Sequence, residues 1–534
     1  MSHRERIGAG VAVAIALISG TVLILLFVAH NTKVVPASGG TYTEGVIGQP
    51  TFINPVLAES DVDKALVRLV FSNAADVATK IEPDKENRQW HLRIKEGLLW
   101  QDGQKVTSDD VIFTIQKIQD HNARSPLFSS WQGVTMQRLS ELEVALTLTT
   151  PYAFLPNALR NLYIVPKHLF AQVPAANWRL SEYNLKPIGN GPYYFSGYEK
   201  NTDGFITTYT LKSNPTYHSG EPLIRTLLVH FSANAQGLIK DFNSGRTDGF
   251  LETGHTYDKD IKRPYQSTVF TMPRYYAVFL NQSKNNALSE LPVRKALQEA
   301  INKSALVEAL FGDGAHVTNG PLPASATGDT EPTSFSLDDA NATLEAAGWQ
   351  MNGDGIREKS DKKTISALKF ALIVPEISFL VDTATSLKNS WKQIGVSVDI
   401  TVKPSSEIVR NTIKNRDYEM LLFGNILGSS LDPFSFWHSS ERFYPGLNIA
   451  LYNNKTVDTL IESLRQHGSQ DGTLFQDINR RIADDIPAIF LYSPSSFYLT
   501  TKAIKGMGSG TIFDPADRFA NISHWYLNTS RVLK

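Results

Sequence analysis

Residues 370–423 read FALIVPEISFLVDTATSLKNSWKQIGVSVDITVKPSSEIVRNTIKNRDYEMLLF, and this stretch decides the fold class. Residues 370–374 predict a strand, and the next apolar residues recur at helical spacing, namely Leu380, Ala384, Leu387, Trp391 and Ile394. Alternating apolar residues predict a second strand over 396–402, a helix is expected over 407–413, and 420–423 predict a third strand. This order predicts an α/β fold, with helices covering a sheet and ligands near the carboxyl ends of its strands.

The same two periodicities appear elsewhere in the chain. Residues 90–94 and 142–148 alternate between apolar and polar types, which predicts half-buried strands. Between them Thr107 is expected to start a helix, because Asp110 follows at the spacing of a capping box. We therefore expect strands and helices to be mixed along the whole body.

The composition excludes several classes of protein. The chain has 534 residues, with 52 Lys and Arg against 53 Asp and Glu, so its formal net charge is -1. A nucleic-acid-binding protein normally carries a basic excess, so we expect no nucleic-acid partner. The count of cysteines is 0, which excludes thiolate metal sites, disulfides, cysteine nucleophiles and a lipid-modified cysteine.

The N-terminal segment predicts attachment to a membrane. An uncharged run at 7–29 is long enough to span a bilayer as a helix, and it follows Arg4 and Arg6. The flank before the run is more basic than the flank after it, which places the N-terminus in the cytoplasm and the body outside. We therefore predict a single-pass protein of the cell membrane with an extracytoplasmic body.

A cleaved signal peptide is the alternative for this segment. Signal peptides usually have apolar regions of roughly 7–15 residues, shorter than the run at 7–29. Val35-Pro36-Ala37 would serve as a cleavage site, but it lies far from the apolar run. Residues 31–40 contain Pro and Gly and are expected to form a short linker.

Motifs of catalysis and metal binding are absent from the sequence. There is no nucleophile elbow, zinc-protease motif, phosphate loop or dinucleotide fingerprint, so we predict no enzyme and no cofactor. Residues 350–361 come nearest to a calcium loop, with Asn352, Asp354 and Asp361 at ligand positions. The acidic first ligand is missing, and a glycine-rich turn explains the segment better. We therefore predict no metal site.

Five segments, found in order along the chain, together resemble motifs of the extracytoplasmic solute-binding proteins of family 5, the dipeptide, oligopeptide and nickel binders of ABC importers. These segments are GLLWQDG at 97–103 with VTSDDV at 106–111, PIGNGPY at 187–193, VRKAL at 293–297 with INK at 301–303, LDP at 431–433 with YNN at 452–454, and IPAIFLY at 486–492. Each alone is a weak signal, whereas five in register are strong.

The resemblance implies a bilobed periplasmic-binding-protein-like clamp of type II, with an extra subdomain, after an N-terminal transmembrane helix. Crossing strands near 273–281 and 486–493 would join the lobes, and a hinge would close them over the ligand. The implied parts are the cytoplasmic tip, anchor and linker at 1–40, lobe I at 41–275 and 493–534 with the extra subdomain at 56–164, and lobe II at 276–492.

The resemblance also implies where a ligand would bind. Gln49, Thr51 and Phe52 match the strand that pairs with the backbone of an extended ligand. Peptide binders present an Asp four residues before the proline of the "D-P" motif to hold the peptide's amine, and this chain has Ser429 there. The family's neighbouring Trp aligns with Asn425 or with the residue after it, and Trp437 would belong to a cleft wall.

These features predict the substrate-binding component of an ABC importer, a monomer that binds a peptide-like or other small polar solute. Its partners would be permease subunits and, through the N-terminal helix, the membrane. A cell-envelope hydrolase and a binding-only surface sensor without a transporter are the alternatives. The changes at Ser429 and Asn425 remove both signature peptide contacts, and a buried ammonium without a counter-charge is costly. We therefore expect weak binding of free-amine peptides.

Overall fold

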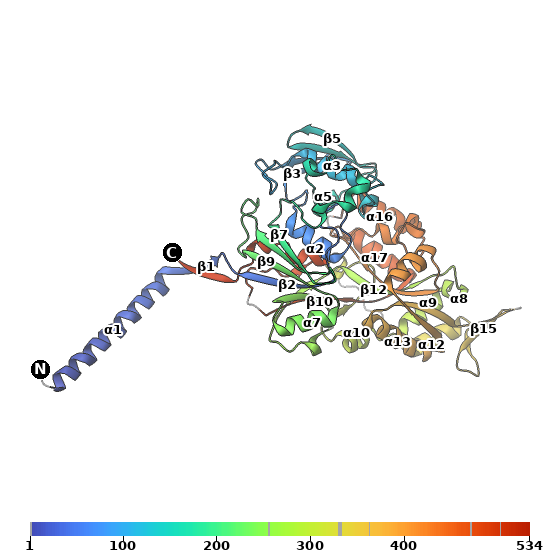
Figure 1. The fold of residues 1–534 in the computed structure, drawn as a ribbon. Helices are drawn as coiled ribbons and strands as arrows, with labels where there is room; N and C mark the ends of the chain where they lie inside the picture. The colour runs from blue at the N-terminus through green and yellow to red at the C-terminus, as the bar shows by residue number, and fades with distance from the viewer. Residues whose placement is uncertain (1–2, 255–256, 329–333, 362–363, 470–471, 502–503) are drawn as a thin grey trace.

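The structure is a computed structural model that describes residues 3–254, 257–328, 334–361, 364–469, 472–501 and 504–534. Within these residues the strands form five sheets, of two, three, four, six and eight strands. Helix α1 (His3–Asn31) projects away from a compact body that holds the other elements (Figure 1).

The eight-stranded sheet combines strands from the early, middle and late parts of the chain, in the order β22-β11-β21-β10-β2-β9-β8-β7. Helix α7 (Ala235–Ser244) packs Leu238 and Phe242 against Phe250 and Leu499 of this sheet. In sheet order the strands are β22 (Gly510–Thr511), β11 (Gln266–Thr271), β21 (Ser496–Thr500), β10 (Gly249–Thr253), β2 (Thr41–Ile47), β9 (Thr226–Ser232), β8 (Ile206–Ser213) and β7 (Tyr193–Lys200).

The six-stranded sheet contains the stretch that predicted the fold class. Its strands, in sheet order, are β13 (Ala315–Val317), β20 (Ala488–Pro494), β12 (Arg274–Leu280), β19 (Met420–Ile426), β17 (Lys369–Pro375) and β18 (Ser397–Lys403). Strand β17 pairs in parallel with both β18 and β19, and helix α13 (Ser378–Lys392) joins β17 to β18. The β-α-β-α-β prediction is confirmed.

Both faces of the six-stranded sheet are covered. Along β12, Tyr275 and Phe279 point into one core and Val278 and Leu280 into another, because side chains alternate along a strand. The helices over the Val278 face are α9 (Leu291–Glu299), α10 (Lys303–Phe311), α12 (Leu337–Ala346) and α13. Those over the Tyr275 face are α15 (Phe434–Trp437), α16 (Lys455–His467) and α17 (Thr473–Asp485).

A four-stranded antiparallel sheet forms a separate layer at the top of Figure 1. Its strands are β3 (Ala78–Pro83), β4 (Gln89–Ile94), β6 (Glu143–Thr147) and β5 (Thr135–Ser140). Helix α3 (Ser108–Ile118) packs with it, and the Asp110 carboxylate accepts the Thr107 backbone N–H at 2.8 Å. The predicted helix start is therefore confirmed. We call residues 78–161 the β3–β6 subdomain.

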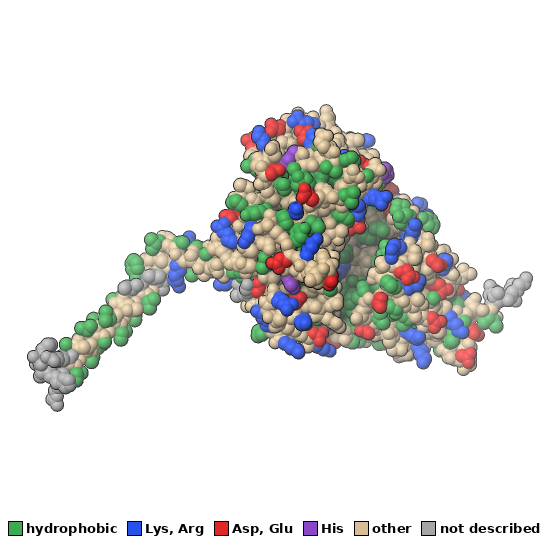
Figure 2. Space-filling model, viewed as in Figure 1, with side chains coloured by type: hydrophobic (Ala, Val, Ile, Leu, Met, Phe, Trp, Pro, Cys, Tyr) green, Lys and Arg blue, Asp and Glu red, His purple; other side chains and the backbone are tan. Residues whose placement is uncertain are grey.

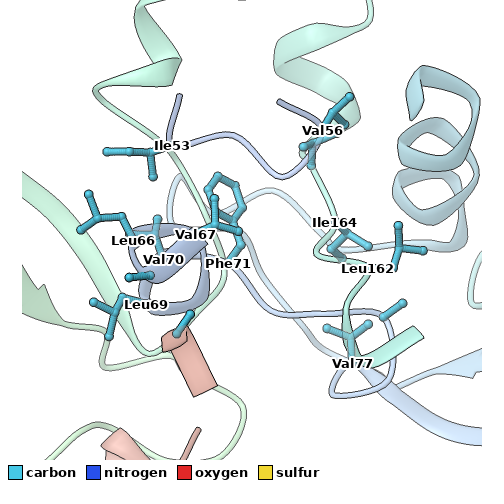
Figure 3. Packing of buried hydrophobic residues seen from close by; sticks show 14 of the residues in the cluster. Ile53, Val56, Leu66, Val67, Leu69, Val70, Phe71, Val77, Leu162 and Ile164 are labelled. Atoms are coloured by element: carbon cyan, nitrogen blue, oxygen red, sulfur yellow. The ribbon is translucent and has the colours of Figure 1, made fainter. Parts of the chain in front are cut away.

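Helix α2 (Asp61–Val70) links this subdomain to the eight-stranded sheet. Figure 3 shows Phe71 beside this helix, on the side of Leu162 and Ile164, within one continuous hydrophobic cluster. The PIGNGPY segment crosses the end of α2, where a Cβ atom on Gly189 would lie 1.9 Å from the Val70 carbonyl oxygen. Only glycine fits this close backbone contact, which gives the motif a packing role.

The chain passes between the eight- and six-stranded sheets twice, from β11 to β12 and from β20 to β21. Arg274 joins the two passages, because its guanidinium donates to the Pro494 carbonyl oxygen from Nε at 3.0 Å and from Nη2 at 2.9 Å. The same side chain also lies within hydrogen-bond distance of Thr253 and Ser496. The chain thus changes sheet next to both predicted segments, 273–281 and 486–493, while β12 and β20 themselves lie within the six-stranded sheet.

The prediction of a linker at 31–40 is wrong. Residues directly after α1 form strand β1 (Thr32–Ala37), which pairs antiparallel over its full length with β23 (Asn528–Leu533). We call this pair the β1–β23 ribbon. Its partner strand is almost five hundred positions away in the sequence, so no local pattern could indicate the pairing.

The remaining elements are short. The remaining α-helices are α4 (Phe128–Trp131), α5 (Leu155–Arg160), α6 (Lys167–Phe170), α8 (Asn286–Ser289), α11 (Ala324–Thr327) and α14 (Ser405–Glu407). A π-helix at Ile408–Ile413 continues α14 where the sequence predicted a helix. A three-stranded sheet joins β14 (Gln350–Met351), β15 (Arg357–Asp361) and β16 (Thr364–Ala367). At its first turn, Asn352 Oδ1 accepts the backbone N–H groups of Asp354 and Ile356. Asn352 thus stabilises a turn, as the alternative to a calcium loop predicts.

Candidate binding cleft

A cavity of about 500 Å³ lies between the β3–β6 subdomain and the loop that follows β19. Figure 2 shows a hollow between the two main bodies of the molecule. One wall includes Trp131, Tyr152 and Asn157, and the opposite wall includes Ser429 and Arg465. Segments far apart in the chain therefore enclose one space.

Ser429 lies at this cavity with an unused hydrogen-bonding group. Its hydroxyl oxygen is buried and has no hydrogen-bond partner within the described residues. Its carbonyl oxygen accepts a hydrogen bond of 3.1 Å from the Asn157 side-chain amide across the cavity mouth. A buried hydroxyl without a partner is costly, so a polar ligand group at this position would be stabilising.

A neighbouring arginine compensates the negative charge of Asp432. The Oδ1 atom of Asp432 accepts the Phe434 backbone N–H at 3.0 Å and so stabilises the turn at Pro433. Burial raises the pKa of Asp432, and the Arg465 guanidinium, with Nε 3.2 Å from Oδ2, opposes that rise. This carboxylate is therefore committed to an internal ion pair.

Arg465 also contacts both walls of the cavity. Its guanidinium lies 4.1 Å from the ring centre of Phe434 and 5.0 Å from that of Tyr152, one from each wall. Its carbonyl oxygen accepts the Ala153 backbone N–H at 2.7 Å. We call these interactions and the hydrogen bond from Asn157 the far contact, because they lie at the opposite end of the cleft from the crossing strands. Burial raises the pKa of Tyr152 to about 12, so its hydroxyl stays protonated near neutral pH.

Another carboxylate lines the cavity. Glu441 accepts a hydrogen bond of 3.0 Å from the Ser440 hydroxyl, and no lysine or arginine pairs with it within the described part of the chain. This residue was not expected at the cleft, because it lies twelve positions after Ser429 and belongs to no motif. It gives the cavity one carboxylate without a cation.

A second cavity of about 440 Å³ adjoins the crossing strands. Its lining includes Arg274, Tyr275, His316 and Leu427. Since Leu427 borders this cavity and Ser429 borders the first, the segment 427–430 lies between the two. An extended ligand running along this segment would reach both cavities.

Asn425 and Trp437 share one partner. The Asn425 side-chain amide and the Trp437 indole N–H donate to the Tyr275 hydroxyl oxygen at 2.9 Å and 3.1 Å. Trp437 is 0% exposed and belongs to the core beneath the sheet, so the structure places it away from the cleft wall predicted for it. Phe434, three residues earlier, lines the cavity instead.

The predicted site segment near the N-terminus does not border either cavity. The backbone N–H groups of Thr51 and Phe52 both donate to Asp63 Oδ1, at 2.8 Å and 3.0 Å. The Gln49 side chain accepts the Ile206 N–H at 3.0 Å. These N–H groups are thus occupied within the protein and cannot pair with a ligand in this conformation. Asn425 is buried near the end of β19 and borders neither cavity, whereas Ser429 on the loop after β19 lines the first cavity. Of the predicted site residues, only Ser429 borders a cavity.

A larger cavity of about 820 Å³ lies between α9 and α17. It is lined by polar residues such as Glu299 and Asn479, and none of its lining residues borders the cavity at Ser429. We base the site on the cavities beside 427–430, because two bodies of the molecule enclose the first of them. Within the described residues, no three His, Asp or Glu side chains gather as a metal site.

Comparison with known proteins decides the family. The sequence profile of the bacterial extracellular solute-binding proteins, family 5 Middle, matches residues 53–442. The chain belongs to this family. It is 26% identical over 514 residues to the oligopeptide-binding protein AppA of Bacillus subtilis, and the match covers 92% of each chain.

Solved structures share the fold. AppA from Bacillus subtilis, in complex with a nonapeptide, superposes with a TM-score of 0.74 at 24% identity, covering 92% of this chain and 100% of AppA. NikZ from Campylobacter jejuni, in complex with Ni(L-His), gives 0.74 at 24% identity and covers 91% and 99%. The fold is therefore the bilobed, mixed α/β type II periplasmic-binding-protein fold, and its N-terminal helix is a candidate membrane span.

Proposed function

We propose that this family 5 protein is the membrane-anchored substrate-binding component of an ABC importer, and that it holds a peptide-like solute in the cavity beside Ser429. The observation that carries the proposal is that cavity, enclosed between the β3–β6 subdomain and the loop after β19. Relatives named as ABC transporter peptide-binding proteins, 22% identical over 320 residues, support the link to a transporter. ABC permease subunits are the proposed protein partner, and the binding protein acts as a monomer.

The lining of the cleft favours a ligand that offers hydrogen bonds. Asn157, Ser429 and Ser430 present amide and hydroxyl groups, while Trp131 and Phe434 supply apolar surface. Such a mixture of aromatic walls and a few polar groups is typical of small-molecule sites. Asp432 is paired with Arg465 and leaves no free charge at the position where peptide binders hold an amine. A peptide with a blocked or absent amine fits the surroundings of Ser429 better than a free one, and Glu441 is the carboxylate of the cavity that a cationic group of the ligand would meet.

We assign one of the two largest sheets to each proposed lobe. Lobe I comprises 41–275 and 493–534, with the extra subdomain at 56–164, and lobe II comprises 276–492. The crossing strands support this division, because the chain changes sheet at Met272–Pro273 and at Ser495. Solute entering the cleft would stabilise closure about these crossings.

The N-terminal helix is proposed to stay attached as an anchor. Ile7–Phe27 is long and apolar enough to cross a membrane, with a mean hydropathy of 2.6 and none of it buried in the protein. Cleavage after Ala37 would remove the whole of β1 and leave β23 without its partner. The ribbon thus favours an intact N-terminus over a cleaved signal peptide.

Mass spectrometry of the solute released from purified protein tests the proposed function. Denaturation should release one peptide-like solute per protein molecule. Ser429→Trp should abolish retention, because the large side chain fills the cavity, whereas Thr456→Trp on the exposed side of α16 should not. A protein that retains no solute and binds no member of a blocked-peptide library would contradict the proposal.

N-terminal sequencing of the protein recovered from cell membranes tests the anchor. The proposal predicts an intact segment before Thr32 and release of the body by protease added to whole cells. A mature N-terminus at Ser38 would refute it.

A further inference from the structure

The β1–β23 ribbon begins where the candidate membrane span ends. The apolar span closes at Phe27, the helix continues to Asn31, and β1 starts at Thr32. With a rise of about 1.5 Å per residue, Thr32 lies roughly 7 Å beyond the apolar span. The headgroup layer of a bilayer has about this thickness on each side. The first rung of the ribbon, at Thr32 and Leu533, therefore reaches the outer edge of the headgroup layer.

The register brings residues 531–534 to the same level as the start of β1. Thr32 faces Leu533, Lys33 faces Val532, and the Lys534 N–H donates to the Asn31 carbonyl oxygen at 2.9 Å. The Arg531 guanidinium reaches back to the Thr32 hydroxyl at 3.2 Å. The last strand of the chain thus returns to the point where α1 leaves the bilayer.

The side chains at this end suit a membrane interface. Leu533 is 75% exposed, and Val34 and Val532 are also exposed. Lys33, Arg531 and Lys534 surround them, and the sequence holds no Asp or Glu at 7–43 or 518–534. Figure 2 shows basic side chains where the helix meets the ribbon. Long basic side chains beside apolar ones are typical of surfaces that bind anionic headgroups.

We infer that the membrane-proximal end of the ribbon is a second membrane contact, in which Leu533 enters the headgroup boundary and the long side chains of Lys33, Arg531 and Lys534 bind anionic phospholipid headgroups. This inference rests on the proposed anchor. A free two-stranded ribbon is only marginally stable in water, so a covering surface also accounts for its formation. With this second contact, the body would be held in a defined orientation relative to the membrane.

Fluorescence quenching by brominated lipids tests the contact. The chain has 0 cysteines, so the full-length protein with Leu533→Cys carries one environment-sensitive label. In phosphatidylcholine vesicles with about a third phosphatidylglycerol, whose negative surface attracts basic residues, the label should be quenched at least twofold. A label at Val34→Cys, two rungs further from the membrane, should be quenched less, and a label at Thr135→Cys on β5 should not be quenched.

Removal of the three basic charges is the second test of the contact. The triple variant Lys33→Gln, Arg531→Gln, Lys534→Gln should lower quenching at position 533 to the value found in pure phosphatidylcholine. Vesicle flotation distinguishes failure of the ribbon contact from failure of the anchor. Protein that floats with vesicles but shows no quenching at 533 or 34 overturns the ribbon contact and leaves the anchor intact. Protein that does not float overturns both, while solute binding is measured independently.

Discussion

The two ends of the cleft are each organised by an arginine, but the arginines make different bonds. At the crossing end, Arg274 donates to backbone carbonyl oxygens and hydroxyls of the strands that join the lobes. At the far contact, Arg465 lies between two aromatic rings and pairs with Asp432. The Arg274 bonds lie beside the two passages of the chain between the sheets, whereas the contact of Arg465 with Tyr152 joins two walls that no neighbouring passage of the chain connects. We infer that the crossing end is permanent and that the far contact opens and closes.

Buried carboxyl groups at the crossing end and at the far contact also differ in their surroundings. Glu252 on β10, next to the crossings, is 3% exposed and has an oxygen without a hydrogen-bond partner among the described residues. Burial raises its pKa to about 8, and the carboxylate of Asp258 adds to the rise. Asp432 is also buried but has Arg465 beside it. A cation therefore compensates the carboxyl of the far contact and not that of the crossing end.

The largest effect is expected at Arg274. Arg274→Met removes the donors to the buried Pro494 carbonyl and should lower the free energy of unfolding by about 2–3 kcal/mol. Urea denaturation measures the change. Arg274→Lys should recover part of it, since one ammonium can replace one donor. A loss below about 0.5 kcal/mol, the range of ordinary surface substitutions, would show that the crossings do not depend on this side chain.

A carboxylate added at the far end should change ligand preference. Ser429→Asp is expected to improve binding of free-amine tripeptides by about 1.5–3 kcal/mol, because a charged hydrogen bond to the ammonium forms. Thr456→Asp on the exposed side of α16 is the control, and N-acetylated peptides should gain nothing. Calorimetry measures both.

Tight binding of free-amine peptides by the unmodified protein would contradict this prediction. Glu441→Gln would then show whether that carboxylate, which lines the same cavity, supplies the counter-charge.

The uncompensated carboxyl should make stability depend on pH. Because the folded-state pKa of Glu252 is raised, this group contributes stability in full below its unfolded-state pKa near 4.5. That contribution is lost as pH rises through the folded-state pKa of about 8. Glu252→Gln should therefore stabilise the protein at pH 9, by about 1–2 kcal/mol, with little change at pH 5. Thermal unfolding at both pH values measures it. An equal effect at both would mean that the carboxyl does not titrate in this range.

The smallest effect is expected from the single hydrogen bond across the far contact. Asn157→Ala removes the donor to the Ser429 carbonyl and should weaken solute binding by about 0.5–1.5 kcal/mol, without lowering the unfolding temperature. Asn161→Ala, at another residue of the cavity lining, is the control. Equal losses in both variants would assign the effect to the lining and not to closure.

Sequence periodicity predicted those parts of the fold that depend on neighbouring residues. The alternation in β4 and β18, the spacing in α13 and the cap of α3 are local patterns, and each appears in the structure. The β1–β23 ribbon and the Arg465–Asp432 pair join residues that no local pattern links. Trp437 was assigned to a cleft because aromatic residues serve in cores and clefts alike. Only the hydrogen bond to Tyr275 shows which role it has.

Distance measurement between paired spin labels tests the clamp most directly. The far-contact pair is Thr135→Cys with Thr456→Cys, and the crossing-end pair is Thr511→Cys with Ala324→Cys, all at exposed positions of a chain with 0 cysteines. The account predicts that a peptide shown to bind by calorimetry shortens the far-contact distance and leaves the crossing-end distance unchanged. Two distances that stay the same on binding, or that change equally, would contradict it.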